Sequence, residues 1–184
     1  YLVETIYNAI GQKVQINRYS KLTTESLRAT GTLAQLKPTG SDNVTRSTLF
    51  FYNAQGKLVG SIDEKNFITA SIYDEKNNTV TTRQYSVATT ASISNTMVWA
   101  DFIAAIPVSN AYQESIKYYD NQERVSKISD TRQGITSYEY DTAGRIITEK
   151  LATDSTNERQ VKTRYNAFGN VTHVLAGEAV NEIK

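Results

Sequence analysis

Few side chains of this 184-residue chain could take part in catalysis. The chain has one histidine, His173, and no cysteine, so a nucleophile activated by histidine would depend on that single imidazole. It contains no Gly-x-Ser-x-Gly sequence, the turn that exposes the catalytic serine of many hydrolases. His173 stands in a strand-like stretch between Val171 and Val174. We therefore expect an ordinary surface or edge histidine, and we predict that the chain is not an enzyme.

Carboxylates stand close together at three places, a spacing that acid–base catalysis could use. The pairs are Asp63 with Glu64, Asp74 with Glu75, and Asp120 with Glu123. Each pair lies in a predicted turn, where an Asp side chain bonds to its own backbone two residues on and so already has a structural task. The ligand spacing of an EF-hand calcium loop is absent. We predict no catalytic residues, no cofactor site and no metal site.

The aromatic side chains leave two interpretations open. The chain has twelve tyrosines and a single tryptophan, Trp99. Exposed tyrosines together with Trp99 could stack on sugars, as in a carbohydrate-binding or adhesive module. Alternatively, the tyrosines pack between repeated hairpins, where each cross-strand aromatic pair contributes roughly 0.2–1 kcal/mol. Packing is favoured because the tyrosines recur at one place in each repeat. Sequons for N-glycosylation at Asn43, Asn77 and Asn170 would be relevant only in a secreted eukaryotic protein.

The charge and hydropathy of the chain exclude further classes. Twenty basic residues balance nineteen acidic ones, and no run of like charges exceeds two residues, so nucleic acid is not an expected partner. The longest apolar stretch, from Met97 to Ile106, is interrupted by Asp101 and is about half the length of a membrane span. Leu, Ile, Val and Phe make up 42 of the 184 residues, which predicts a folded chain with a thin core. Frequent Thr, Val, Ile and Tyr favour strands.

A short pattern recurs six times along the chain. It consists of Tyr, Asn or Asp, two variable residues, a turn residue and, shortly after, an aliphatic residue. The six copies begin at Tyr7-Asn8, Tyr52-Asn53, Tyr73-Asp74, Tyr119-Asp120, Tyr140-Asp141 and Tyr165-Asn166, with Gly11, Gly56, Asn77, Glu123, Gly144 and Gly169 as turn residues and Val14, Leu58, Val80, Val125, Ile146 and Val171 as aliphatic ones. Asn or Asp followed by Gly or Asn is the chemistry of a hairpin turn. Each copy therefore predicts two antiparallel strands joined by a tight turn.

A longer period organises these copies. A shift of 66 or 67 residues aligns Tyr7 with Tyr73 and Tyr140, and Tyr52 with Tyr119. We therefore divide the chain into repeat units at about 7–72, 73–139 and 140–184.

Each of the two longer units is predicted to contain one short helix. Trp99, Phe102, Ile103 and Ile106 have helical spacing, with Ser94, Asn95 and Thr96 as candidate caps and Pro107 as the stop. In the first unit Leu33 and Leu36 take the places of Trp99 and Phe102, and Pro38 ends the segment.

With these residues in hand, the sequence resembles the RHS or YD-repeat family, whose name describes the Tyr-Asp step. That step is present at Tyr73-Asp74, Tyr119-Asp120 and Tyr140-Asp141, and the family's second half is matched by Asp130, Gly134, Thr136 and Tyr140, and again by Asp63, Thr69 and Tyr73. The resemblance covers nearly the whole chain apart from the helical inserts and the tail after Val174. It implies a mainly β fold of antiparallel hairpin repeats, forming a curved strip or part of a shell, with one or two short inserted helices.

The resemblance also implies a function. In bacterial members of the family the shell encloses a toxic segment, so residues 1–184 are expected to be a fragment of the array, secreted or at the cell surface. Its expected role is structural, and its expected partners are further RHS repeats or other segments of the same toxin assembly, with cell-surface glycans under the alternative adhesive role. The chain has no Asp-Pro pair, so the family's self-cleaving motif has no counterpart. It begins at Tyr1 without a signal-peptide pattern, and we expect a processed or excised piece.

Overall fold

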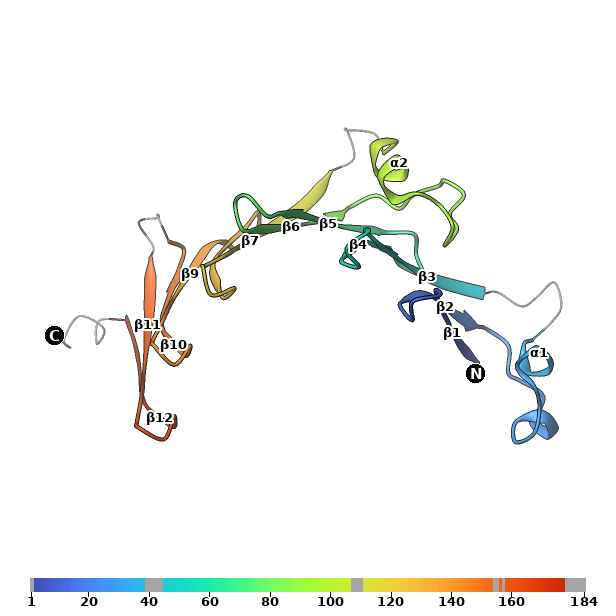
Figure 1. Ribbon diagram of the computed structural model, residues 1–184, viewed down its shortest axis with the longest axis horizontal. Helices are drawn as coiled ribbons and strands as arrows, with labels where there is room; N and C mark the ends of the chain where they lie inside the picture. Colours follow the sequence, from blue (N-terminus) through green and yellow to red (C-terminus); the bar gives the residue numbers. More distant parts are fainter. Residues whose placement is uncertain (1, 39–44, 107–110, 154–155, 157, 178–184) are drawn as a thin grey trace. The chain divides into compact units, whose positions relative to one another are not determined.

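The fold is mainly β, as the sequence predicts. The computed structural model describes all residues except 1, 39–44, 107–110, 154–155, 157 and 178–184. Twelve strands form one antiparallel sheet in which spatial order follows chain order from β1 to β12 (Figure 1). Every strand therefore pairs with its sequence neighbours, and the described residues form an open meander accompanied by two short α-helices.

The strands are short and β-branched or aromatic residues are frequent in them. Their bounds are β1 Val3–Tyr7, β2 Lys13–Tyr19, β3 Thr45–Tyr52, β4 Leu58–Ile62, β5 Ile68–Asp74, β6 Thr79–Tyr85, β7 Tyr112–Tyr119, β8 Val125–Asp130, β9 Gly134–Tyr140, β10 Ile146–Leu151, β11 Arg159–Tyr165 and β12 Val171–Ala176. Five of the six repeated tyrosines end the first strand of their hairpin, and Tyr73 is the last residue but one of β5. In a meander, alternate turns lie at the same end of the sheet, so within each part of the sheet the tyrosine hairpins share one end.

Both predicted helices are present and both are short. Helix α1 spans Leu33–Leu36 and follows a 3₁₀ turn at Glu25–Leu27. Thr32 and Gln35 form a reciprocal capping box at its start, a Thr-x-x-Gln signature that the sequence carries. Helix α2 spans Trp99–Ala104, and its N-cap is Val98 without a side-chain bond, so the prediction of a cap at Ser94, Asn95 or Thr96 is wrong. Pro107, the predicted stop, lies outside the described residues.

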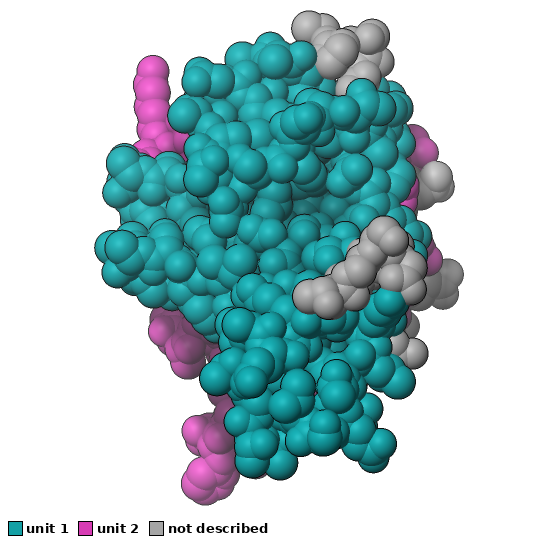
Figure 2. Space-filling view, turned by 90° about the vertical axis from the view of Figure 1, so that its right-hand side faces the viewer, with its two compact units in different colours: residues 1–71, 84–112 teal, residues 72–83, 113–184 magenta. Residues whose placement is uncertain are grey.

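The chain forms two compact units, shown in different colours in Figure 2. Unit 1 comprises residues 1–71 and 84–112, and unit 2 comprises residues 72–83 and 113–184. The buried hydrophobic side chains of the described residues all belong to unit 1: Leu49, Phe51, Ile62, Ile68 and Ala70. They lie on β3, β4 and β5, so the thin core that the composition predicts is concentrated on three strands.

A single insertion covers this core. The residues between β6 and β7, of which 86–106 and 111 are described, form what we call the strap. The strap is fixed at the turn after β4, where the Thr89 amide donates to the Asn66 carbonyl at 2.9 Å. Its helix α2 places the Trp99 ring against Phe51, with the ring centroids 4.9 Å apart and the planes 23° from parallel. Ile93, Met97, Phe102, Ile103 and Ile106 pack on the same cluster.

Gly60 of β4 makes this contact possible. A Cβ built on Gly60 would lie 2.0–2.3 Å from three atoms of the Trp99 ring, so only a glycine leaves room for the indole. The ring occupies the space where β4 has no side chain.

Unit 2 is built differently, because its sheet has no second layer among the described residues. The buried side chain that it contributes is polar, Thr148 of β10. All other described residues of β7 to β12 are half-buried or exposed. Unit 2 therefore combines half-buried apolar surface with hydrogen bonds, ion pairs and ring contacts at its turns.

Candidate functional site

The most regular feature of the molecule is a set of five turns with one hydrogen-bonding pattern. We call them the tyrosine turns: residues 7–12, 52–57, 119–124, 140–145 and 165–170. In the turn at Tyr140, the Asp141 amide donates to the Arg145 carbonyl, and Asp141 Oδ1 accepts from the amides of Ala143 and Arg145, both at 2.9 Å. The turns with Asn8, Asn53, Asp120 and Asn166 repeat these bonds. The prediction that these side chains bond to the backbone of their own turn is confirmed.

Each tyrosine turn is followed by a β-bulge. The tyrosine pairs with the residue six positions later, as Tyr140 does with Ile146, and the next paired residue on the second strand is two positions further on. The skipped residues are Val14, Val59, Ser126, Ile147 and Thr172. A bulge raises the local twist and redirects side chains, so the repeat imposes the same bend on each hairpin. The aliphatic position of the sequence pattern therefore pairs with the tyrosine in most copies, but Val14 is a bulge residue.

In three of the tyrosine turns, the tyrosine hydroxyl joins the hairpin to the one before it. Tyr140 Oη donates to the Val125 carbonyl at 2.6 Å, and Tyr165 Oη donates to the Ile146 carbonyl at 3.0 Å. In unit 1, Tyr52 Oη donates to the Lys13 carbonyl at 3.0 Å. Each acceptor is the residue that pairs with the tyrosine of the preceding tyrosine turn: Lys13 pairs with Tyr7, Val125 with Tyr119 and Ile146 with Tyr140. These hydroxyls are thus engaged in packing between hairpins.

An arginine adds a second connection between neighbouring hairpins in unit 2. Arg124 pairs with Asp120 of its own turn at 2.7 Å, and its guanidinium lies 4.5 Å from the centroid of the Tyr140 ring in the next turn. Arg145 repeats both contacts with Asp141 and Tyr165. Cation–π contacts at exposed sites contribute about 0.5–1 kcal/mol. Each aspartate therefore holds the arginine that covers the following tyrosine.

In unit 1 a glutamine takes the place of this arginine. Gln12 accepts from Asn8 Nδ2 and donates to the Gly56 carbonyl of the next turn at 3.1 Å. Adjacent hairpins are again joined through this position.

These bonds lower the pKa of the turn aspartates. For Asp120 the main cause is the Arg124 side chain, followed by the Arg124 amide, and for Asp141 the Arg145 amide comes first and the Arg145 side chain second. A carboxyl whose pKa is lower in the folded state than in the unfolded chain stabilises the fold above its unfolded pKa. That contribution is lost as the pH falls through the folded-state value.

This linkage gives a testable pH dependence. The double variant D120N/D141N keeps the turns, since Asn8, Asn53 and Asn166 support the same bonds, but it loses both ion pairs. We expect lower stability than wild type at pH 7 and a difference that shrinks as the pH falls towards 2 through the lowered folded-state pKa of the two aspartates. Urea unfolding at both pH values measures this. If the stability difference between the wild type and the variant were the same at pH 2 as at pH 7, the ion pairs would not be its cause.

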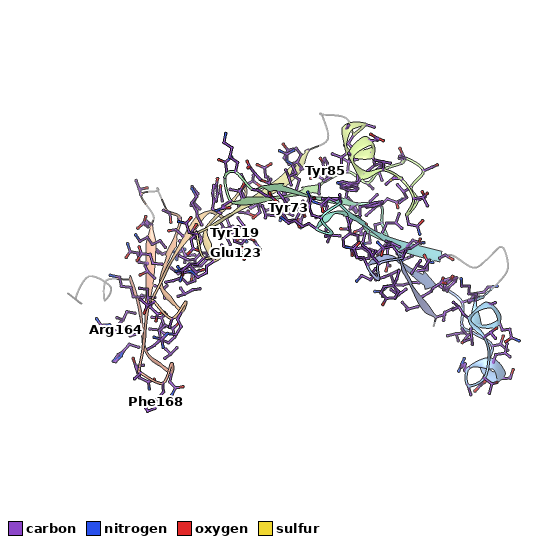
Figure 3. The ribbon with its side chains drawn as sticks, in the orientation of Figure 1. Tyr73, Tyr85, Tyr119, Glu123, Arg164 and Phe168 are labelled. Carbon is purple, nitrogen blue, oxygen red and sulfur yellow. The ribbon has the colours of Figure 1, made fainter. Side chains whose placement is uncertain are left out.

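The fifth position of the tyrosine turn is left-handed in all five copies. Four copies have glycine there, with φ between 78° and 85°, whereas the fifth has Glu123, labelled in Figure 3. The φ of Glu123 is 60°. A left-handed conformation costs a residue with a Cβ roughly 1–2 kcal/mol. We expect Glu123→Gly to stabilise the fold by about 1 kcal/mol, less than the full strain because glycine also gains freedom in the unfolded chain. Chemical denaturation measures the change. Glu123→Ala, which keeps the Cβ, should bring no gain; equal stabilisation by both variants would exclude backbone strain as the cause.

Two turns differ from the sequence expectation. The copy beginning at Tyr73 forms a hairpin with a different set of bonds: Asp74 Oδ1 accepts from the Asn77 amide and Asp74 Oδ2 accepts from the Asn77 side chain. Its left-handed residue is Asn78, not the predicted Asn77. Conversely, Asp63 makes the complete set of turn bonds without a preceding tyrosine, and Asn66 takes the left-handed position at φ 65°. Asparagine tolerates that conformation better than most residues, which explains both cases.

The other predicted candidates lie apart from one another. His173 is exposed on the edge strand β12, next to Thr172, as expected. Glu64 pairs with Arg18 at 2.6 Å. Asn77 and Asn170 lie at turns, and Asn43 lies outside the described residues. Within the described ranges, no group of three His, Asp or Glu residues could hold a metal ion.

A polar network in unit 1 was not predicted. Asn17 of β2, only 8% exposed, accepts from Gln15 Nε2 and Ser47 Oγ, both at 2.7 Å, and donates to Glu4. Glu4 also accepts from Tyr19 and pairs with Lys37, and the Lys37 side chain is the main cause of its lowered pKa. Burial is the main cause that raises the pKa of Tyr19. The partners come from β1, β2, β3 and the segment after α1. The sequence does not predict that they meet, because their proximity depends on the pairing register of these strands.

None of the described helices combines the length and the apolar character needed to cross a membrane. No family model matches the chain, and no curated protein matches its sequence significantly.

Proposed function

We propose that the chain is a non-enzymatic structural scaffold of the RHS/YD-repeat type, part of a shell in a secreted bacterial toxin or surface protein that encloses or displays another segment. The observation that carries this proposal is the connection between successive tyrosine turns. The same tyrosine hydroxyl bond recurs three times, and the aspartate–arginine–tyrosine contact recurs twice. Interactions that recur between successive hairpins can extend a wall, whereas a binding site breaks the repeat.

The single-layer sheet of unit 2 also supports this role. A sheet needs a covered face to bury apolar surface, yet the described residues of unit 2 place no hydrophobic side chain in full burial. Half-buried apolar residues such as Ile116, Ile128 and Ile135 remain available to a further segment. Further repeats or other segments of the same assembly are the proposed partners, in a secreted or cell-surface setting.

The alternative role, an adhesive module in which tyrosines stack on sugars, has less support. Stacking needs a free ring face, but Arg124 lies over Tyr140 and Arg145 lies over Tyr165. Trp99 packs on Phe51 and over Gly60. These rings already have protein partners.

Photo-crosslinking in the secreted assembly from the native source tests the scaffold. Ile116 and Lys117 are neighbours on β7 and project from opposite faces of the sheet. With a photoreactive residue at each position in turn, we expect one of the two to crosslink to another segment of the same assembly. The same photoreactive residue at Phe168, a turn position labelled in Figure 3, serves as control. Phe168 is 91% exposed. If neither face crosslinks to polypeptide, the enclosing or displaying role is wrong.

A further inference from the structure

Unit 1 contains a groove that the tyrosine turns do not use. A cavity of about 570 Å³, open to solvent, lies between the strap and the sheet. Ile93, Ser94 and Asn95 of the strap form one wall. The rest of the lining comes from β2, β3 and the turn after β4: Gln15, Thr45, Arg46, Ser47, Leu49, Glu64 and Asn66. The groove is large enough for one or two sugar rings, and most of the side chains that line it are polar.

The charges at this groove are unbalanced. Arg18 and Arg46 lie directly opposite each other on β2 and β3. Like charges in that position destabilise a sheet unless a counter-charge lies between them. Glu64 pairs with Arg18 at 2.6 Å, whereas Arg46 has no ion-pair partner among the described residues. Within the described part of the chain, one paired carboxylate thus accompanies two opposed arginines, and a second carboxylate would balance them.

Several uncharged polar side chains of the groove are held in place by hydrogen bonds to one another and to Asn17. Gln15 Nε2 donates to the buried Asn17, and Gln15 Oε1 accepts from Asn95 Nδ2 of the strap at 3.0 Å. Ser47 is fixed by its own bond to Asn17. The Asn66 side chain makes no bond to any other described residue. Amide, hydroxyl and guanidinium groups therefore line one cavity, and each retains donors or acceptors for a ligand.

We infer that this groove binds an acidic saccharide, a sugar ring that carries a carboxylate. The carboxylate accepts two parallel hydrogen bonds from the Arg46 guanidinium, which fits that geometry. The ring hydroxyls bond to the side chains of Asn66, Asn95 and Ser47. Leu49 and Ile93 offer apolar contact to the C–H face of the ring. This inference does not depend on the proposed scaffold role, since no tyrosine lines the groove.

The test is a titration of the isotopically labelled full chain, followed by amide NMR. The probes are methyl glucuronide, methyl glucoside, which has the same ring without the charge, and sodium acetate, which has the charge without the ring. We expect methyl glucuronide alone to shift the signals of Arg46, Ser47, Asn66 and Asn95 in a saturable way. No saturable shift would overturn the inference. Equal shifts with acetate would overturn it too, because the groove would then bind anions without recognising the sugar.

Variants locate the effect. Arg46→Gln alters an exposed side chain that has no ion-pair partner among the described residues, so the fold should be retained. We expect affinity for methyl glucuronide to fall at least about tenfold. Lys162→Gln is the control: it also removes one positive charge, but on β11, beside an open hollow of unit 2. It should leave the affinity for methyl glucuronide unchanged. Wild-type affinity in Arg46→Gln, or equal losses in both variants, would contradict the assignment.

Discussion

Replacing Gly60 by alanine should expel Trp99 from the core of unit 1 and destabilise that unit by about 3 kcal/mol. The added Cβ would lie 2.0–2.3 Å from three ring atoms, and β4 cannot withdraw because both its neighbours are paired to it. Overpacking of this kind costs typically 1–3 kcal/mol, and loss of the indole contact adds to it. Trp99 is the chain's only tryptophan, so its fluorescence emission should move to longer wavelength as the ring becomes exposed to water.

A double-mutant cycle separates this contact from other effects of the alanine. Trp99→Ala should itself cost about 3–5 kcal/mol, the range for large aromatic side chains. In that background Gly60→Ala has no ring to displace and should cost less than about 1 kcal/mol, which gives a large coupling energy. Ser61→Ala, one residue along β4 and on the opposite face, is the matched control and should change little. Unaltered emission and stability in Gly60→Ala would show that Trp99 does not occupy this position.

The sequence predicts the hairpins well because their determinants are local. Asn or Asp followed three residues later by a glycine is enough to specify a turn whose bonds all lie within five residues. The tyrosine before it marks where the strand ends. Both helices are predicted for the same reason, since spacing such as that of Trp99, Phe102 and Ile103 is a local property. The start of α2 was misplaced because Ser94, Asn95 and Thr96 satisfy cap statistics, while Asn95 is engaged with Gln15, 80 residues away.

The contacts that give unit 1 its core are not local, and the sequence does not predict them. A glycine within the strand Leu58–Ile62 indicates that something approaches the backbone closely, but nothing in the sequence identifies Trp99 as that partner. The groove beneath the strap is also formed by non-local contacts and is not predicted for the same reason. Arg46 and Arg18 become neighbours only through the register of β2 and β3, and Asn95 reaches Gln15 only because the strap crosses the sheet. Pairing register and insertion path therefore mark the limit of prediction from this sequence.

Tyr140→Ala should destabilise unit 2 by about 2–3 kcal/mol, the largest effect that we expect there from a single side chain. The variant loses the hydroxyl bond to Val125 and the ring that lies beneath Arg124. It also removes half-buried aromatic surface from a sheet that has no hydrophobic core among its described residues. Urea unfolding of the full chain, followed by hydrogen exchange of the β8 and β10 amides, measures the loss and its location. A loss distributed equally over both units would contradict a local connection between hairpins.

Tyr140→Phe isolates the hydroxyl bond, and Tyr7 supplies the control within the same chain. A hydrogen bond of this kind contributes about 0.5–1.5 kcal/mol, so Tyr140→Phe should cost about 1 kcal/mol while retaining the contact with Arg124. Tyr7 holds the same place in the first tyrosine turn, but no described hairpin precedes it and the residue is 61% exposed. Tyr7→Phe should therefore leave stability unchanged. A similar loss in both variants would mean that the hydroxyl acts within its own turn, and the connection between successive hairpins would then rest on the arginines alone.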